Sequence, residues 1–180
     1  MENEDNMINK MGAVMDHDAL LALCTAQPPL IEPFDPAMLQ PNGLELSLES
    51  VWRMARYGSL PAPGAVERTF PDYYAIKPDR EGWWHLERGC YKVIYSEYVR
   101  IPADLCAFAR PRSSLLRMGA WIATALWDSG YEGRSESLLV VENPAGIRLQ
   151  RGARLIQLVF LTLGKAAGKL YEGRYLGENK

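Results

Sequence analysis

The sequence predicts a mainly β domain, built as an antiparallel barrel or a double-sheet roll. Three observations lead to this prediction. Short runs rich in Val, Ile, Leu, Trp and Tyr recur at a spacing of about 8–12 residues, with turn residues between them. Stretches with the 3.6-residue periodicity of a helix are few. The chain has 180 residues, of which 48% are hydrophobic, and this is enough for one domain with a sizeable core.

The first part of the chain predicts a polar tail, a short helix and one strand. Residues 1–15 begin MENEDNMINK, so we expect a flexible tail ahead of a single domain at residues 16–180. Asp16 is a suitable N-cap for a short helical run at residues 19–24, which ends before a Pro-Pro pair. Residues 44–48 alternate Leu with Glu and Ser, which is the period of a half-buried strand.

The rest of the chain predicts a long irregular stretch followed by a series of strands. Residues 52–82 include SLPAPGAVERTFPDYY and are expected to form a surface excursion. Strands are predicted wherever β-branched and aromatic residues cluster between turn residues. These predicted strands are residues 83–86, 91–99, 105–110, 120–127, 138–141, 146–149 and 155–163.

The composition argues against several classes of protein. The formal net charge is −2 and no basic stripe with interleaved aromatic residues occurs, so no nucleic-acid partner is expected. No apolar run approaches the roughly 20 residues of a membrane span, and the start of the chain lacks an apolar signal region. Three cysteines without metal-ligand spacing and only two histidines argue against a zinc site, including that of a zinc-dependent deaminase. We expect a cytoplasmic protein with no membrane partner.

The stretch RSSLLRMGAWIATALWDSGYEG, residues 112–133, begins with groups that suit phosphate. These are Arg112, Ser113, Ser114 and Arg117. Guanidinium groups bind phosphate oxygens in forked, charge-assisted pairs, and Ser hydroxyls can donate to the remaining oxygens. The same four residues would also fit a surface salt-bridge patch beside a helical turn. This segment alone therefore leaves both interpretations open.

The same stretch ends in a carboxylate turn. Asp128 follows an apolar run and lies in a turn that contains glycine, where its carboxylate could orient and deprotonate a water. Asp-Ser-Gly is also ordinary turn chemistry. Tyr131 could stack on a sugar or a base, or it could belong to the core.

Three features outside this stretch could serve the same site. Glu45 points away from the Leu side of its strand and could help hold a hydrated Mg²⁺, although an exposed strand glutamate is the commoner explanation. Gln157 is a polar residue in an apolar strand, so it needs a hydrogen-bond partner, either a ligand or the backbone. Residues 171–177, YEGRYLG, could close over a site or be a frayed end.

Taken in order, these segments resemble the dUTPase and dCTP deaminase superfamily. The segments that carry the resemblance are IEPFDPAMLQPNGLELSL, RPRSSLLRMG, WDSGYEG, RGARLIQLVF and LYEGRYLG. They cover roughly residues 30–50 and 83–177, and the last is similar to the short tail of archaeal-type trimeric dUTPases. The resemblance implies a distorted jelly roll (a dUTPase-like β-clip) with one short N-terminal helix. It also implies a homotrimer with its sites at subunit interfaces.

The resemblance implies a role for each candidate residue. The triphosphate would be contacted by Arg112, Ser113, Ser114, Arg117 and Gln157. The base pocket would be lined, largely through backbone groups, by Ala123, Thr124 and Ala125. Asp128 would bind the deoxyribose 3′-hydroxyl or position the attacking water, and Tyr131 would pack under the sugar. Arg174 and Tyr175 would belong to a closing tail. Glu45 would support Mg²⁺ through water, with no direct protein ligand to the metal.

Two reactions occur in this superfamily, and Leu138 bears on which one applies. In the deaminases a glutamate lies ten residues beyond the motif aspartate, where this chain has Leu138, which cannot transfer a proton. Glu136 lies two residues earlier on the same strand face, so a local slip could bring it into place. The spacing from Asp128 to Gly152 matches the dUTPase pattern without a gap, however. The sequence thus favours hydrolysis of dUTP to dUMP and pyrophosphate, by water attack on the α-phosphate.

Alternatives remain open because the chain departs from the family pattern. Glu45 stands where an aspartate is usual, Ser129 where a proline is frequent, and the chain end lacks a long glycine-rich arm. The alternatives are a dCTP deaminase, a bifunctional deaminase and dUTPase, or an inactive nucleotide-binding regulatory trimer.

Overall fold

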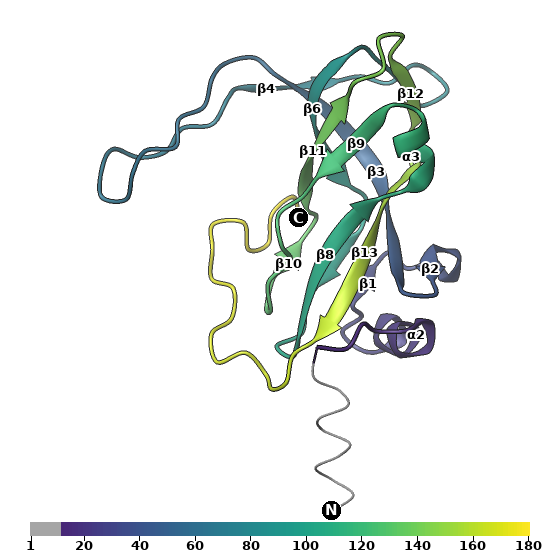
Figure 1. Cartoon of the computed structure of the whole chain (residues 1–180), viewed down its shortest axis with the longest axis vertical. Coiled ribbons are helices and arrows are strands. Elements are labelled where there is room, and N and C mark those ends of the chain that lie inside the picture. Colours follow the sequence, from purple (N-terminus) through teal and green to yellow (C-terminus); the bar gives the residue numbers. More distant parts are fainter. Residues whose placement is uncertain (1–11) are drawn as a thin grey trace, which may run out of the picture.

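The structure, a computed structural model, describes residues 12–180 and confirms a mainly β fold with one main helix (Figure 1). The helices are α2 (His17–Thr25), α3 (Ser113–Arg117) and the short 3-10 helix η1 (Pro36–Met38). The strands are β1 (Ile31–Glu32), β2 (Leu39–Gln40), β3 (Gly43–Met54), β4 (Tyr73–Ile76), β5 (Trp83–Leu86), β6 (Gly89–Tyr95), β7 (Tyr98–Arg100), β8 (Leu105–Pro111), β9 (Ala120–Ala123), β10 (Glu132–Gly133), β11 (Glu136–Val141), β12 (Ile147–Gln150) and β13 (Arg154–Thr162). Within residues 12–180, no helix is long and apolar enough to cross a membrane.

The strands form one large antiparallel sheet and two small ones. The large sheet runs β8-β13-β3-β6-β11-β9, with β2 and β4 also paired to β3. The small sheets are β1-β7-β10 and β12-β5. Strand β3 joins the two halves of the large sheet, because its first part pairs with β13 and its second part with β6. Register shifts beside both pairings bend the sheet into a barrel-like shape (Figure 1).

The core lies inside this curved sheet and follows the period of two expected for strands. In β13 the buried residues Ile156, Leu158 and Phe160 alternate with the less buried Gln157 and Val159. Each fully buried side chain of this size contributes about 1.5–3 kcal/mol by leaving water. The alternation fixes which residues of β13 face the core and which remain available on the other side.

Several predicted elements are confirmed, and others end earlier than expected. Asp16 caps α2, since its carboxylate accepts a hydrogen bond from the Ala19 backbone at 2.9 Å. The predicted strand at residues 91–99 is two strands, because the chain turns at Ser96 and Glu97. The predicted strand at residues 120–127 stops at Ala123.

Helix α3 has no counterpart among the predicted helices.

After β9, the chain leaves the sheet and Trp127 pairs with Ala107 of β8 through two backbone hydrogen bonds of 2.9 Å. This departure explains why β9 is short.

The predicted excursion is partly strand and partly a projecting arm. Residues 52–54 and 73–76 pair as the end of β3 and β4, and the arm between them, residues 55–72, extends away from the sheet (Figure 1). The paired segments of the arm are linked by backbone hydrogen bonds between Ser59 and Thr69. At the other end of the chain, residues 1–11 of the predicted tail lie outside the described residues. Residues 12–15 run beside the end of β13, to which they hydrogen-bond.

Candidate functional site

One predicted phosphate ligand, Arg112, is held by a buried carboxylate. Arg112 immediately follows β8 and precedes α3, and its Nε lies 2.5 Å from Oε1 of Glu45. Nη1 of Arg154 lies 3.2 Å from the other oxygen of Glu45. Glu45 is only 3% exposed, so the exposed strand glutamate considered above is wrong. Its carboxylate instead holds two guanidinium groups in fixed positions.

Gln157 lies beside this carboxylate in the sheet. The register of β3, β13 and β8 places Glu45, Gln157 and Arg110 next to one another across three strands. The Gln157 amide donates a hydrogen bond to the Asn42 carbonyl at 3.0 Å, which supplies the partner expected for a polar residue in this strand. Its carbonyl oxygen accepts no hydrogen bond from residues 12–180. Gln157 is therefore held by one N–H of its amide, and the second N–H can donate to a ligand.

Helix α3 carries the remaining phosphate candidates. Ser113, Ser114 and Arg117 are all exposed, and Arg117 makes no ion pair within the described part of the chain. Ser114 and Arg112 line a cavity of about 390 Å³ together with three further arginines. These are Arg148, Arg151 and Arg154. The cavity is therefore strongly cationic, as a site for phosphate requires.

The carboxylate turn lies at the opposite end of β8. Its backbone is held by hydrogen bonds from Tyr131 N to the Asp128 carbonyl (3.0 Å) and from Gly130 N to the Ile101 carbonyl (2.9 Å). The Ser129 hydroxyl donates to the Leu105 carbonyl at 2.6 Å, at the first residue of β8. Gly130 has φ +83°, a conformation that favours glycine. The turn therefore presents the exposed Asp128 from a rigid base.

Two further cavities lie near this turn, and the first of them, of about 280 Å³, is directly beside it. Predicted site residues Ala125, Asp128, Tyr131 and Tyr175 all line it. The Tyr131 hydroxyl donates to the Glu178 carboxylate at 2.7 Å and lies 3.1 Å from Ser135 Oγ. Burial raises the pKa of Tyr131 and also that of Glu178. The structure thus brings the aspartate and the tyrosine together at one cavity.

A second cavity, of about 270 Å³, adjoins the first. Its lining includes Ala123, Ala125 and Leu138. Lys92 and Glu136 also line it, and the Lys92 ammonium lies 2.8 Å from Glu136 Oε1. Glu136 and Ala125 line both cavities. The two cavities therefore form neighbouring compartments, and the second is faced by Leu138 and by Glu136, which is paired with Lys92. Thr124 lies between two lining residues but does not itself line either cavity.

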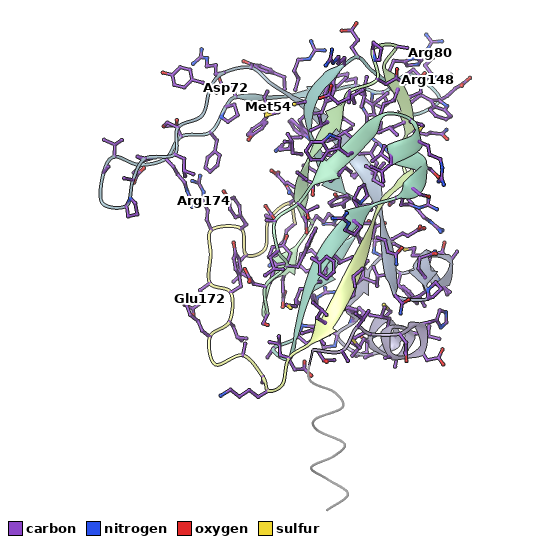
Figure 2. All side chains as sticks on the ribbon, viewed as in Figure 1. Met54, Asp72, Arg80, Arg148, Glu172 and Arg174 are labelled. Atoms are coloured by element: carbon purple, nitrogen blue, oxygen red, sulfur yellow. The ribbon has the colours of Figure 1, made fainter. Side chains whose placement is uncertain are left out.

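The C-terminal tail packs against the first cavity. The Tyr171 ring meets Tyr131 edge-on, with centroids 5.7 Å apart, and Gly177 N donates to the Glu132 carbonyl at 2.7 Å. Of the two predicted tail residues, only Tyr175 reaches the cavity. Arg174 instead lies over the Phe70 ring of the arm, with its guanidinium carbon 5.2 Å from the ring centroid (Figure 2).

The two halves of the predicted site lie far apart within one chain. Asp128 is anchored at the start of β8 and Arg112 follows its end. Seven residues of strand at roughly 3.3 Å each separate them by about 20 Å. Figure 1 shows α3 and β10 toward opposite ends of β8. The phosphate cluster and the carboxylate cavity are therefore separate sites on one chain.

Several residues of the site were not identified from the sequence. Arg154 pairs with Glu45 from 109 positions away, and Lys92 reaches Glu136 across 44 positions. Ser135 and Glu178 contact Tyr131 in ways that depend on the turn and the tail. The sequence signals available for Arg154 and Lys92 were a basic residue in RGAR and a lysine in a β-rich run. Neither signal is distinctive alone.

Comparisons with known proteins identify the family of this chain. Residues 14–163 match the family described as dCTP deaminase-like. A Methanosarcina mazei protein named "Probable deoxyuridine 5'-triphosphate nucleotidohydrolase" is 45% identical over 169 residues, covering 93% of this chain and 98% of that protein. The Methanocaldococcus jannaschii deoxyuridine 5'-triphosphate nucleotidohydrolase is 37% identical over 140 residues, covering 77% and 87%.

A solved structure is also similar. It is the 2'-deoxycytidine 5'-triphosphate deaminase from Agrobacterium tumefaciens, with a TM-score of 0.62 and 25% identity. The match covers 85% of this chain and about half (49%) of that one. The sequence motifs, the β-rich fold and these relatives agree, and the chain belongs to the dCTP deaminase-like family.

Proposed function

We propose that this protein hydrolyses dUTP to dUMP and pyrophosphate. The observation that carries the proposal is Leu138, which lines the second cavity where a family deaminase has its acid. A leucine cannot exchange a proton with a pyrimidine ring. The two archaeal relatives, which match 93% and 77% of this chain, are named as dUTP nucleotidohydrolases, and this supports the same reaction.

Asp128 is the residue we assign to the attacking water. It is exposed at the cavity wall, on a turn fixed by three hydrogen bonds, so its carboxylate can hold a water in one orientation. By accepting a proton from that water, it would assist attack at the α-phosphorus. Tyr131, beside it, would pack under the deoxyribose. Ala123 and Ala125 would line the space for the base, with Thr124 contributing backbone groups.

The phosphate cluster would bind the leaving pyrophosphate. Arg112, Arg117 and the hydroxyls of Ser113 and Ser114 supply donors for charge that develops on its oxygens. Gln157 would add the second N–H of its amide, since the first is donated to the Asn42 carbonyl. Glu45 acts in this scheme by orienting Arg112, since its carboxylate is already engaged by that guanidinium.

A second copy of the chain would complete each site. The cluster at Arg112 and the turn at Asp128 lie about 20 Å apart along β8, which exceeds the separation that one reacting triphosphate allows. We therefore propose a homotrimer of jelly-roll domains in which one copy supplies Asp128 and Tyr131 and another supplies the arginines. In such an assembly the tail residues Arg174 and Tyr175 would close over a site shared between copies.

The residues present fit a Mg²⁺ ion that arrives with the triphosphate. Residues 12–180 contain no cluster of three or more His, Cys, Asp or Glu that could hold a metal. Mg²⁺ prefers oxygen ligands, retains several waters and is commonly held by substrate phosphates. Glu45, whose two oxygens are engaged by Arg112 and Arg154, would act on the ion only indirectly, by holding the arginines that bind the same phosphates. When bound, the ion would neutralise phosphate charge and so favour departure of pyrophosphate.

The proposal also covers the domain bounds and the location of the protein. We propose a single domain at residues 16–180, with residues 1–15 as a tail and residues 52–82 as an excursion that includes the arm. We also propose a cytoplasmic location, which the three free cysteines support.

A product assay tests the reaction directly. The protein is incubated with dUTP or dCTP and Mg²⁺, and nucleotides and pyrophosphate are separated by chromatography. We expect dUMP and pyrophosphate from dUTP. Conversion of dCTP to dUTP without pyrophosphate release from dUTP would overturn the proposal, and formation of dUMP from dCTP would identify a bifunctional enzyme.

An aspartate variant tests the mechanism. Asp128→Asn should lower kcat by on the order of 10²-fold or more, as expected for loss of a general base. Asp104→Asn makes the same chemical change on an exposed residue before β8 and should leave kcat unchanged. Near wild-type turnover of the Asp128 variant would exclude the aspartate from the chemistry.

A further inference from the structure

We propose that the ion pair between Lys92 and Glu136 reads the pyrimidine edge and selects uracil over cytosine. The inference rests on the proposed function, because it assumes that the sugar occupies the cavity beside Asp128 and Tyr131. It assigns base selectivity to two side chains outside the sequence motifs.

The sheet register places the pair on the wall of the base compartment. Ala123 lies opposite Leu138, Leu138 lies opposite Lys92, and Lys92 lies opposite Trp52. These residues form one row across β9, β11, β6 and β3, and neighbouring strands are about 4.8 Å apart. Glu136 lies two residues before Leu138 on β11, on the same face. A base resting over Ala123 and Leu138 would therefore meet both charged side chains.

The two charged groups are fixed yet accessible. The Lys92 ammonium lies 2.8 Å from Glu136 Oε1 and within 4.2 Å of the Tyr73 ring centroid and 5.1 Å of the Trp52 centroid. Their side chains are 16% and 31% exposed respectively. Oε2 of Glu136 accepts no hydrogen bond from residues 12–180, so it remains available to a ligand. Contacts with two rings and a carboxylate restrict the ammonium to a small region.

The order of the two groups, counted outward from the sugar, decides which base fits. Glu136 lines both the cavity of Asp128 and the cavity of Leu138, whereas Lys92 lines only the latter. Glu136 is therefore nearer the sugar and Lys92 farther away. The pocket presents an acceptor first and a donor second.

Uracil matches this order and cytosine does not. Outward from the glycosidic bond, the edge of uracil presents the O2 acceptor, the N3–H donor and the O4 acceptor. Glu136 can accept from N3–H while Lys92 donates to O4. In cytosine N3 is an acceptor and the 4-amino group is a donor, so each would face a like group on the protein. Neither alternative register rescues cytosine, because its O2 and N3 are both acceptors.

A charge-swapped variant tests the order rather than the mere presence of the pair. K92E/E136K keeps an ion pair but presents a donor first and an acceptor second, which matches cytosine. The measured quantity is the ratio of kcat/KM for dUTP to that for dCTP, with dCTP consumption followed by pyrophosphate release. The ratio should fall by at least about 100-fold, because sites that hydrogen-bond a substrate strongly reject analogues that lack the matching group.

A matched control lies at the other end of the same two strands. Arg88 and Glu142 flank β6 and β11 and form an exposed ion pair, with Nη2 2.8 Å from Oε2. R88E/E142R makes the same exchange outside both cavities and should leave the ratio within about twofold of wild type. Thermal unfolding of both swaps monitors folding.

Each outcome either supports or overturns the inference. An unchanged ratio in folded K92E/E136K, or an equal loss on both substrates, would overturn it and leave the pair as structural support. If the swap fails to fold, Lys92→Met keeps the apolar stem and must itself lower the ratio by at least about tenfold. Failure to do so would overturn the inference. Wild-type protein that releases no pyrophosphate from dUTP would instead refute the proposed function.

Discussion

Replacing Glu45 by glutamine tests whether this carboxylate is the clamp that holds the phosphate-binding arginine. The change removes one negative charge from a residue that is 3% exposed and leaves its volume nearly unchanged. It also leaves two guanidinium groups, those of Arg112 and Arg154, facing a neutral amide that can accept fewer hydrogen bonds.

The expected loss of stability follows from the geometry of the two contacts. Hydrogen bonds to charged groups contribute about 1.5–3 kcal/mol each, and removing one partner of a fully buried ion pair costs about 3–5 kcal/mol. The guanidinium side chains here are 37% and 30% exposed, so water compensates part of that loss. We therefore expect Glu45→Gln to lower the free energy of unfolding by about 2 kcal/mol. For a chain of this size, that corresponds to roughly 4–8 °C in Tm.

A second glutamate on the same strand supplies the control. Glu49 also faces an arginine, but its oxygen lies 3.8 Å from Arg151 Nε and both side chains are about half exposed. Exposed pairs of this kind contribute about 0–1 kcal/mol. Glu49→Gln should therefore change the free energy of unfolding by less than about 1 kcal/mol and leave activity unchanged.

Urea unfolding and steady-state kinetics together decide the question. Glu45→Gln should lower kcat/KM for dUTP by about tenfold or more, because a released Arg112 no longer points at one position. Equal stability losses in the two variants would refute the reasoning that Glu45 is a buried clamp. A large loss of stability with unchanged kcat/KM would show that the clamp supports the fold but not phosphate binding.

Two further predictions concern Glu97 and Leu138. Glu97 is buried, accepts hydrogen bonds from Ser47, and has a pKa raised chiefly by burial. The native state therefore holds a proton that the unfolded chain releases, so the free energy of unfolding falls as pH rises from the ordinary glutamate pKa through the raised one. Glu97→Gln should flatten this dependence in urea unfolding from pH 4 to 8, and an identical slope would contradict it. Leu138→Glu should not confer deamination, because Lys92 lies opposite position 138 and would pair with the new carboxylate. Deamination is measured as dUTP formed from dCTP, and rapid formation of dUTP would refute this prediction.

The local patterns of the sequence predicted those elements that depend on neighbouring residues. Alternation at residues 44–48 lies within β3, and the cap at Asp16 forms as expected, because both depend on contacts within a few positions. The break at residues 96–97 depends on a distant partner. Glu97 turns inward to accept two hydrogen bonds from Ser47, 50 positions earlier, and no local signal in the sequence marks that pairing.

The candidate site shows the same division. The residue types that suit phosphate and water activation could be identified in order along the chain, because each type has its own chemistry. The burial of Glu45 could not be predicted, because it depends on Arg112 and Arg154, which lie on other elements. Nor could the placement of Arg174 on the arm, since the arm has no pattern that predicts its direction.

The continuous pairing of β8 with β13 connects the fold to the proposed assembly. Its ends are fixed independently, at Leu105 by the Ser129 hydroxyl and after Pro111 by a hydrogen bond from Arg112 N to the Leu155 carbonyl (2.9 Å). Full pairing with β13 along its length prevents the strand from folding back. The separation of about 20 Å between the arginine cluster and the carboxylate turn is therefore a property of the sheet and not of a flexible loop. In the proposed trimer, a neighbouring copy would therefore supply the arginine cluster that completes the site beside Asp128.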